Sequence, residues 1–132
     1  MCGKTESEKA LVDMLAQETM DFRNGFVRVA YNPNMESMKD DYIKNVKTKI
    51  TTFSKFLGDK PWFAGKEITY VDFPLYELFD QHRMFEPQLL DGFDNIKAFL
   101  DRFEALPAIK AYMASPEFLR YPVNNNTASW VG

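Results

Sequence analysis

Apolar residues recur at helical spacing through the first half of the chain. One stripe runs from about Thr5, where Thr5 and Glu8 fit a capping box, to Tyr31. It ends at Asn32-Pro33, because a proline pushes the preceding residue out of the α region. A second stripe runs from about Met35 to Leu57. The two stripes comprise Leu11, Leu15, Phe22, Phe26 and Val29, and then Ile43, Val46, Ile50, Phe53 and Leu57. Both predict amphipathic helices with one face in a core.

A third helix is predicted from Val71 to about Met84, with a strong start signal. Thr69 suits the N-cap position and Asp72 falls at N3, which together form a capping box. Ile68 and Phe73 stand where a hydrophobic staple would form. The helix is apolar nearly all round, which is typical of the centre of a bundle. We interpret Thr69 and Asp72 as folding residues rather than catalytic ones.

Two shorter helices are expected beyond it. Asp94 is predicted to cap a helix that carries Ile96, Phe99, Leu100 and Phe103, and Pro107 suits the first turn of a helix through Met113. Alternating apolar and polar positions, the pattern of a strand, are almost absent. The sequence therefore predicts an all-α fold, an irregular bundle of about five helices, with residues 1–132 as one domain.

Composition excludes several classes of protein. The 132 residues are 45% hydrophobic and 27% charged, with a net charge of -3 and one cysteine. These values exclude a disordered chain and a disulfide framework, and favour neither a nucleic-acid nor a membrane partner. No apolar run approaches the roughly 20 residues of a spanning helix. The start leads directly into charged residues rather than an apolar signal core, so we expect a cytoplasmic protein.

The usual catalytic motifs are absent from the sequence. No phosphate loop or metal-ligand spacing occurs, so we expect no metal and no cofactor. His82 lies on the apolar third helix with no visible partner, and we interpret it as a packed or surface histidine. Cys2 has no neighbour clearly placed to lower its pKa, and we interpret it as an inert thiol.

The first helix carries a second, partly apolar face. Met20, Asn24, Val27 and Tyr31 step by 4, 3 and 4 and fall nearly opposite the core stripe. Met and Tyr suit a wall that receives varied apolar molecules. Asp21 and Arg28 lie on one flank, where they could meet a polar group. Another domain, another subunit, a ligand, the chain's own tail or solvent could each face this side.

Several segments resemble cytosolic glutathione transferases. Phe63-Ala64-Gly65 with Ile68-Thr69-Tyr70-Val71-Asp72-Phe73 resembles the capping box and staple of their helical C-terminal domain. Four further segments resemble the mu class: Thr19-Met20-Asp21, Tyr31-Asn32-Pro33, the run from Phe56 to Gly65, and Phe103-Glu104-Ala105-Leu106-Pro107 with Ile109-Lys110-Ala111-Tyr112-Met113. The resemblance covers nearly the whole chain.

The resemblance implies roles for individual residues. Tyr31 matches the tyrosine that faces the electrophile and assists as a hydrogen-bond donor. Met20, Asn24 and Val27 match the lining of the hydrophobic substrate site, and Asn124 and Asn125 match tail positions that close it. Asp21 matches the carboxylate that reaches the glutathione amino group in the neighbouring subunit. Arg28 and the two tail asparagines depart from the family's more apolar pattern.

The resemblance also implies a function for the complete enzyme. It would be a dimer that conjugates glutathione, its co-substrate, to hydrophobic electrophiles in detoxification. The family's thioredoxin-like domain, which binds glutathione, has no counterpart here, so we expect little activity from this chain alone. A fragment, a truncated gene model and a genuine short protein all remain open. The alternative hypothesis is a non-enzymatic binding or interaction module.

Overall fold

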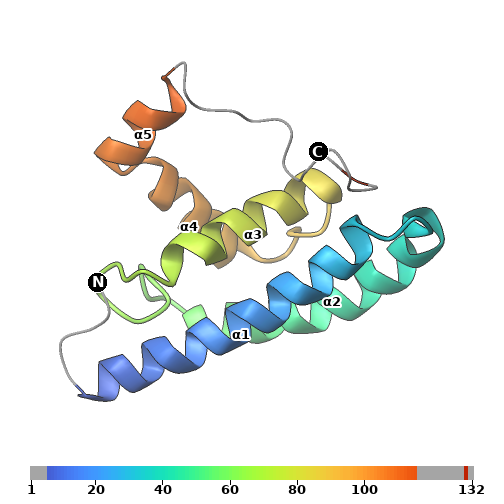
Figure 1. The fold of residues 1–132 in the computed structure, drawn as a ribbon. Helices are drawn as coiled ribbons and strands as arrows, with labels where there is room; N and C mark the ends of the chain where they lie inside the picture. Colours follow the sequence, from blue (N-terminus) through green and yellow to red (C-terminus); the bar gives the residue numbers. More distant parts are fainter. Residues whose placement is uncertain (1–5, 116–129, 131–132) are drawn as a thin grey trace.

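The computed structural model describes residues 6–115 and Trp130. The chain forms α1 (Glu6–Ala30), α2 (Met35–Leu57), α3 (Asp72–Phe85), α4 (Asp94–Glu104) and α5 (Pro107–Met113) (Figure 1). Over this part of the chain the only β pairing is an isolated bridge between Trp62 and Gly65. The all-α prediction is confirmed, and the predicted helices agree with the observed ones to within a few residues. None of the helices in the described part is long and apolar enough to cross a membrane.

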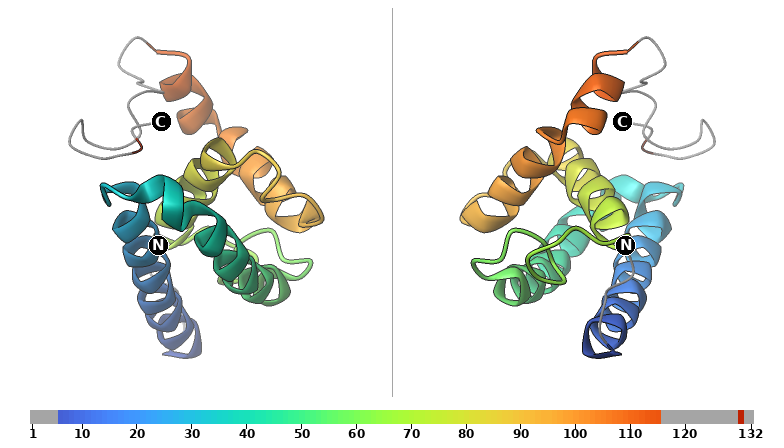
Figure 2. Two further views of the ribbon diagram at one scale, coloured as in Figure 1. Left: turned by 90° about the vertical axis from the view of Figure 1, so that its right-hand side faces the viewer. Right: turned by 90° about the vertical axis from the view of Figure 1, so that its left-hand side faces the viewer.

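The helices pack around α3 and α4. α1 and α2 lie side by side, α3 packs on α1, and α4 packs on both α2 and α3. α5 contacts α4 and lies at the end of the molecule away from the α1–α2 pair (Figure 2). Among the helices of the described residues, α2 and α3 are the ones that pack on α1, which leaves a long side of α1 with none of these helices against it.

An aromatic cluster links three helices at the centre of the core. The ring of Phe22 on α1 lies 5.5 Å from that of Phe53 on α2 and 5.4 Å from that of Phe79 on α3. Phe63, in the loop after α2, stacks on Phe79 with centroids 6.1 Å apart. All four side chains are buried. Truncating one such ring costs about 3–5 kcal/mol, so this cluster holds α1 in a fixed orientation against α2 and α3.

The start of α3 differs in part from the predicted capping box. The Asp72 carboxylate is fully buried and accepts hydrogen bonds from the backbone N–H of Thr69 at 2.8 Å and of Phe63 at 3.0 Å. Burial raises the pKa of Asp72, and these two bonds act against that rise. The Thr69 hydroxyl, however, is buried without a hydrogen-bond partner among the described residues. The N-cap position falls on Val71, so only the carboxylate half of the box is present.

The start of α4 also departs from the prediction. Asp94 is the first residue of the helix rather than its cap, and the N-cap residue is Phe93, whose carbonyl accepts from the N–H of Ile96. Asn95 instead ties α4 to the end of α2: its side-chain amide donates to the carbonyls of Ser54 at 2.8 Å and Gly58 at 3.1 Å. The carboxylate of Asp94 is left to interact with the helix dipole from an exposed position. The capping box predicted at Thr5 lies outside the described residues.

Candidate functional site

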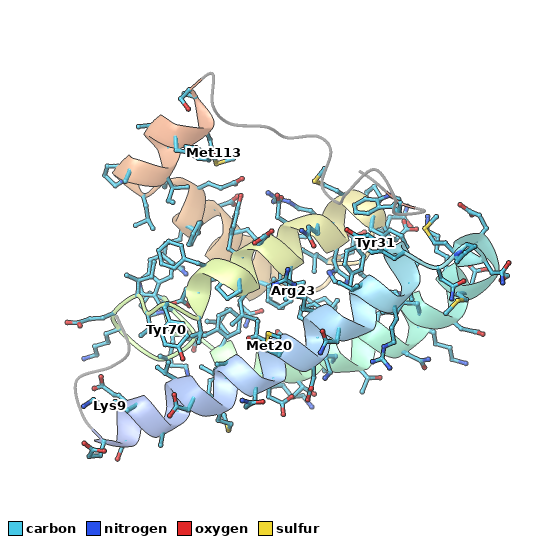
Figure 3. The ribbon with its side chains drawn as sticks, in the orientation of Figure 1. Lys9, Met20, Arg23, Tyr31, Tyr70 and Met113 are labelled. Carbon is cyan, nitrogen blue, oxygen red and sulfur yellow. The ribbon has the colours of Figure 1, made fainter. Side chains whose placement is uncertain are left out.

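The predicted second face of α1 (Met20, Asn24, Val27 and Tyr31) lies outside the packed core. Met20 is 50% exposed and Val27 is 36% exposed, while Phe22 and Phe26 on the other side of the same helix are buried. Asn24 is exposed and Tyr31 is half-buried. Figure 3 shows Met20 near the middle of α1 and Tyr31 at its end. An apolar methionine and valine thus meet solvent on a helix whose core positions are already filled.

Tyr31 directly follows the last residue of α1. Its backbone N–H donates to the carbonyl of Val27 at 3.0 Å, which continues the helical geometry by one residue. The side chain packs against a small second core at this end of the molecule, formed by Phe26, Val29, Ala30, Met35 and Phe85. Helix geometry and this packing together fix the ring at the end of the second face.

Trp130 also belongs to this end of the molecule, a placement that helical periodicity did not predict. Its backbone N–H donates to the carbonyl of Ala30 at 2.9 Å. Its ring stands edge-on to the rings of Phe26 at 5.7 Å and Phe85 at 5.2 Å. The predicted tail residues Asn124 and Asn125 lie outside the described residues.

Charged side chains flank the second face. Asp21 is exposed, and Arg28 donates from Nε to the carbonyl of Asn24 at 3.3 Å. Arg23, which was not among the residues predicted for this face, is exposed on the other flank; Figure 3 shows it extending from α1 in the direction of α3. At about 100° per residue, Arg23 lies about 60° from Met20 around the axis of α1. This angle places it beside the second face, so helical spacing alone was enough to find it.

His82 is a packed histidine, the first of the two placements expected from the sequence, and it has hydrogen-bond partners that the sequence did not indicate. It is fully buried between the rings of Phe22 and Phe26, whose centroids lie 4.6 and 4.4 Å away. The carbonyl of Leu78 can only accept, so Nδ1 carries the proton in that 2.6 Å bond, and Nε2 accepts from the hydroxyl of Tyr42 at 2.6 Å. Burial lowers the pKa of His82 to about 4. The imidazole is therefore neutral at pH 7 and closed to solvent.

A cavity between the first half of α1 and the second half of α2 was not anticipated. It measures about 440 Å³, and Met14, one of its apolar residues, is 46% exposed. The lining residues are Met14, Leu15, Glu18, Asn45, Thr48, Lys49, Thr52, Phe53 and Phe56. Sequence periodicity assigned Leu15 and Phe53 to the core stripes, which says nothing about a hollow beside them. We call this feature the α1–α2 groove.

The described residues offer no alternative centre for metal chemistry. Among residues 6–115 and Trp130, no three His, Cys, Asp or Glu side chains gather closely enough to hold a metal ion. Cys2 lies outside the described residues. The second face of α1 and the α1–α2 groove are thus the two surfaces to compare with known proteins.

Comparison with known sequences connects the chain to one family. The family described as "Glutathione S-transferase, C-terminal domain" matches residues 20–116. The chain is 48% identical to the mouse protein Glutathione S-transferase Mu 5 and 47% identical to human Glutathione S-transferase Mu 1, over 130 residues in each case. These matches cover 98% of this chain but only 58% and 60% of the two relatives. The chain therefore spans little more than half the length of the curated relatives it matches.

Solved structures agree with this match. The glutathione S-transferase Blo t 8 superimposes with a TM-score of 0.85 at 27% identity, over 98% of this chain and 63% of that protein. The pi-class glutathione S-transferase of Onchocerca volvulus gives a TM-score of 0.84 at 30% identity, over 96% of this chain and 62% of that protein. The helix arrangement, the family match and the sequence identity all indicate the same family. The chain belongs to the glutathione S-transferase C-terminal domain family.

Proposed function

We propose that this chain is the electrophile-binding helical part of a mu-like glutathione transferase that acts in detoxification in the cytoplasm. The observation that carries this proposal is the near-50% identity to Mu relatives along 98% of the chain. The exposed apolar positions of the second face add support, because they lie where the resemblance puts the substrate wall. In this proposal Met20, Asn24 and Val27 hold the apolar body of the electrophile.

The reaction would be a nucleophilic substitution or addition by glutathione. With an aryl halide, the thiolate sulfur forms a bond to the ring carbon and the halide leaves, while the thiol proton goes to solvent. The thiolate and the groups that stabilise it would come from a glutathione-binding domain. This chain would supply orientation, with Tyr31 as an assisting hydrogen-bond donor toward the electrophile. One such donor is worth about 1–3 kcal/mol of the activation barrier.

We further propose that the complete enzyme is a homodimer. Asp21 would then contact glutathione bound to the neighbouring subunit, as the resemblance implies. The α1–α2 groove is an apolar surface that a second subunit could cover, since Met14 and Phe56 line it from the two helices. Replacing Met14 by Asp should weaken the dimer, which sedimentation velocity would measure. An unchanged dimer would place the interface elsewhere.

A chimera tests the enzymatic proposal. The segment of mouse Mu 5 that precedes the matched region would be joined to this chain and assayed with glutathione and an aryl halide. We expect turnover by the chimera, little turnover by the chain alone, and a rate reduced about ten-fold or more by Tyr31→Phe. The mouse protein is the positive control. A folded chimera that binds glutathione without turnover would favour the alternative, a non-enzymatic binding module.

A further inference from the structure

Two arginines bracket the second face of α1 on opposite sides. Taking Met20 as the centre and about 100° per residue, Arg23 lies about 60° to one side and Arg28 about 80° to the other. Both side chains are exposed. The apolar positions Met20 and Val27 therefore lie between two guanidinium groups.

Arg28 is directed over the second face rather than away from it. Its Nε donates to the carbonyl of Asn24, one helical turn earlier, at 3.3 Å. A helical side chain leans toward the N-terminus, so this bond lays the guanidinium alongside Asn24. Because Nε is used in this bond, the two terminal nitrogens are the ones that can meet a ligand.

Neither arginine is paired with an acid in the described part of the chain. The ion pairs there involve other cations, such as Lys49 with Glu18 at 3.9 Å and Arg83 with Glu104 at 3.2 Å. Within residues 20–31 the charged side chains are Asp21, Arg23 and Arg28, so this stretch of α1 carries two positive charges and one negative. The chain as a whole has a net charge of -3, which makes this local positive balance a departure from the rest of the surface.

We propose that the second face selects apolar electrophiles that carry an anionic group, such as an aryl or enone carboxylate. The apolar body lies on Met20 and Val27, and Arg23 and Arg28 receive the anion. This inference rests on the proposed function, because it names the substrate class of the same face. A polyanion such as nucleic acid fits less well, since two cations flank an apolar strip rather than forming a basic track.

A pair of dyes that differ in charge tests the inference on the chain itself. Anilinonaphthalene sulfonate and the uncharged phenylnaphthylamine share their ring system, so the sulfonate alone distinguishes them. Binding of each dye would be measured by fluorescence for the unaltered chain, Arg23→Gln, Arg28→Gln and the double variant. Lys49→Gln, on the α1–α2 groove, is the matched control. Circular dichroism would confirm that each variant is folded.

We expect each arginine variant to weaken sulfonate binding by about three- to five-fold, as for a partly exposed charge pair, and the double variant by about ten-fold or more. Binding of the uncharged dye should change less than two-fold. Unchanged sulfonate binding in the double variant would overturn the inference, as would an equal loss for both dyes or a loss caused by Lys49→Gln. If the uncharged dye fails to bind while the sulfonate still depends on the arginines, the anion site stands and the apolar site of the proposed function fails.

Discussion

The Asp72 carboxylate gives a sharp prediction about stability. It accepts two backbone hydrogen bonds, from Thr69 at 2.8 Å and Phe63 at 3.0 Å, and it is fully buried. A hydrogen bond to a charged acceptor contributes about 1.5–3 kcal/mol, and an orphaned buried N–H is costly in its own right. Asp72→Asn keeps one acceptor oxygen but turns an NH2 group toward the second backbone N–H. It should therefore lower the free energy of unfolding by about 2–3 kcal/mol. Asp72→Ala loses both bonds and should cost about 3–5 kcal/mol.

Urea denaturation followed by tryptophan fluorescence measures these free energies of unfolding. For a domain of this size each kcal/mol shifts Tm by roughly 3–5 °C, so the alanine variant should melt on the order of 10 °C or more below the unaltered chain. The exposed Asp40 on α2 provides a matched control, since Asp40→Asn removes the same charge without touching a buried bond. If the free energies of unfolding of Asp72→Asn and Asp40→Asn differ by less than about 0.5 kcal/mol, the proposed role of the buried hydrogen bonds is refuted.

Two further predictions follow from buried polar groups. Thr69→Val should lower the free energy of unfolding by less than about 0.5 kcal/mol or raise it, because the Thr69 hydroxyl has no hydrogen-bond partner among the described residues. A decrease of more than about 1 kcal/mol in urea denaturation would show that this hydroxyl caps α3. Because of His82, the free energy of unfolding should decrease as the pH decreases. The pKa of His82 is about 4 in the folded chain, below the ordinary value of 6.5. Below pH 6.5 the unfolded chain therefore binds a proton at His82 that the folded chain does not bind, and this favours unfolding. From about pH 7.5 to about pH 5 the unaltered chain should therefore lose about 2 kcal/mol more than His82→Gln, and equal pH dependence of the two proteins would contradict this assignment.

Helical periodicity predicted most of the fold because core positions recur regularly. Val46, Ile50, Phe53 and Leu57 all lie buried on one side of α2, as expected from their spacing. The central position of α3 also follows from its sequence, since its apolar residues are spread around the helix rather than confined to one side. Leu75, Leu78 and Phe79 are buried there, whereas Phe73, whose ring packs edge-on against that of Phe103, remains 37% exposed.

Tertiary geometry explains what the sequence could not predict. The Asp72 carboxylate also accepts a hydrogen bond from Phe63, a loop residue nine positions away that no local motif specifies. The anchor of Trp130 on Ala30 joins positions 100 residues apart. The α1–α2 groove depends on how two helices diverge, which spacing within either helix does not determine. The second face of α1 was predictable because it lies on one helix.

The most direct test of that face is the binding of uncharged phenylnaphthylamine to Val27→Asp and Met14→Asp. Both variants place a carboxylate at an exposed apolar position of α1, one on the second face and one in the α1–α2 groove. If the second face is the apolar binding surface, Val27→Asp should weaken dye binding about ten-fold or more, and Met14→Asp should leave it within two-fold. Unchanged binding to Val27→Asp with a loss in Met14→Asp would contradict the account.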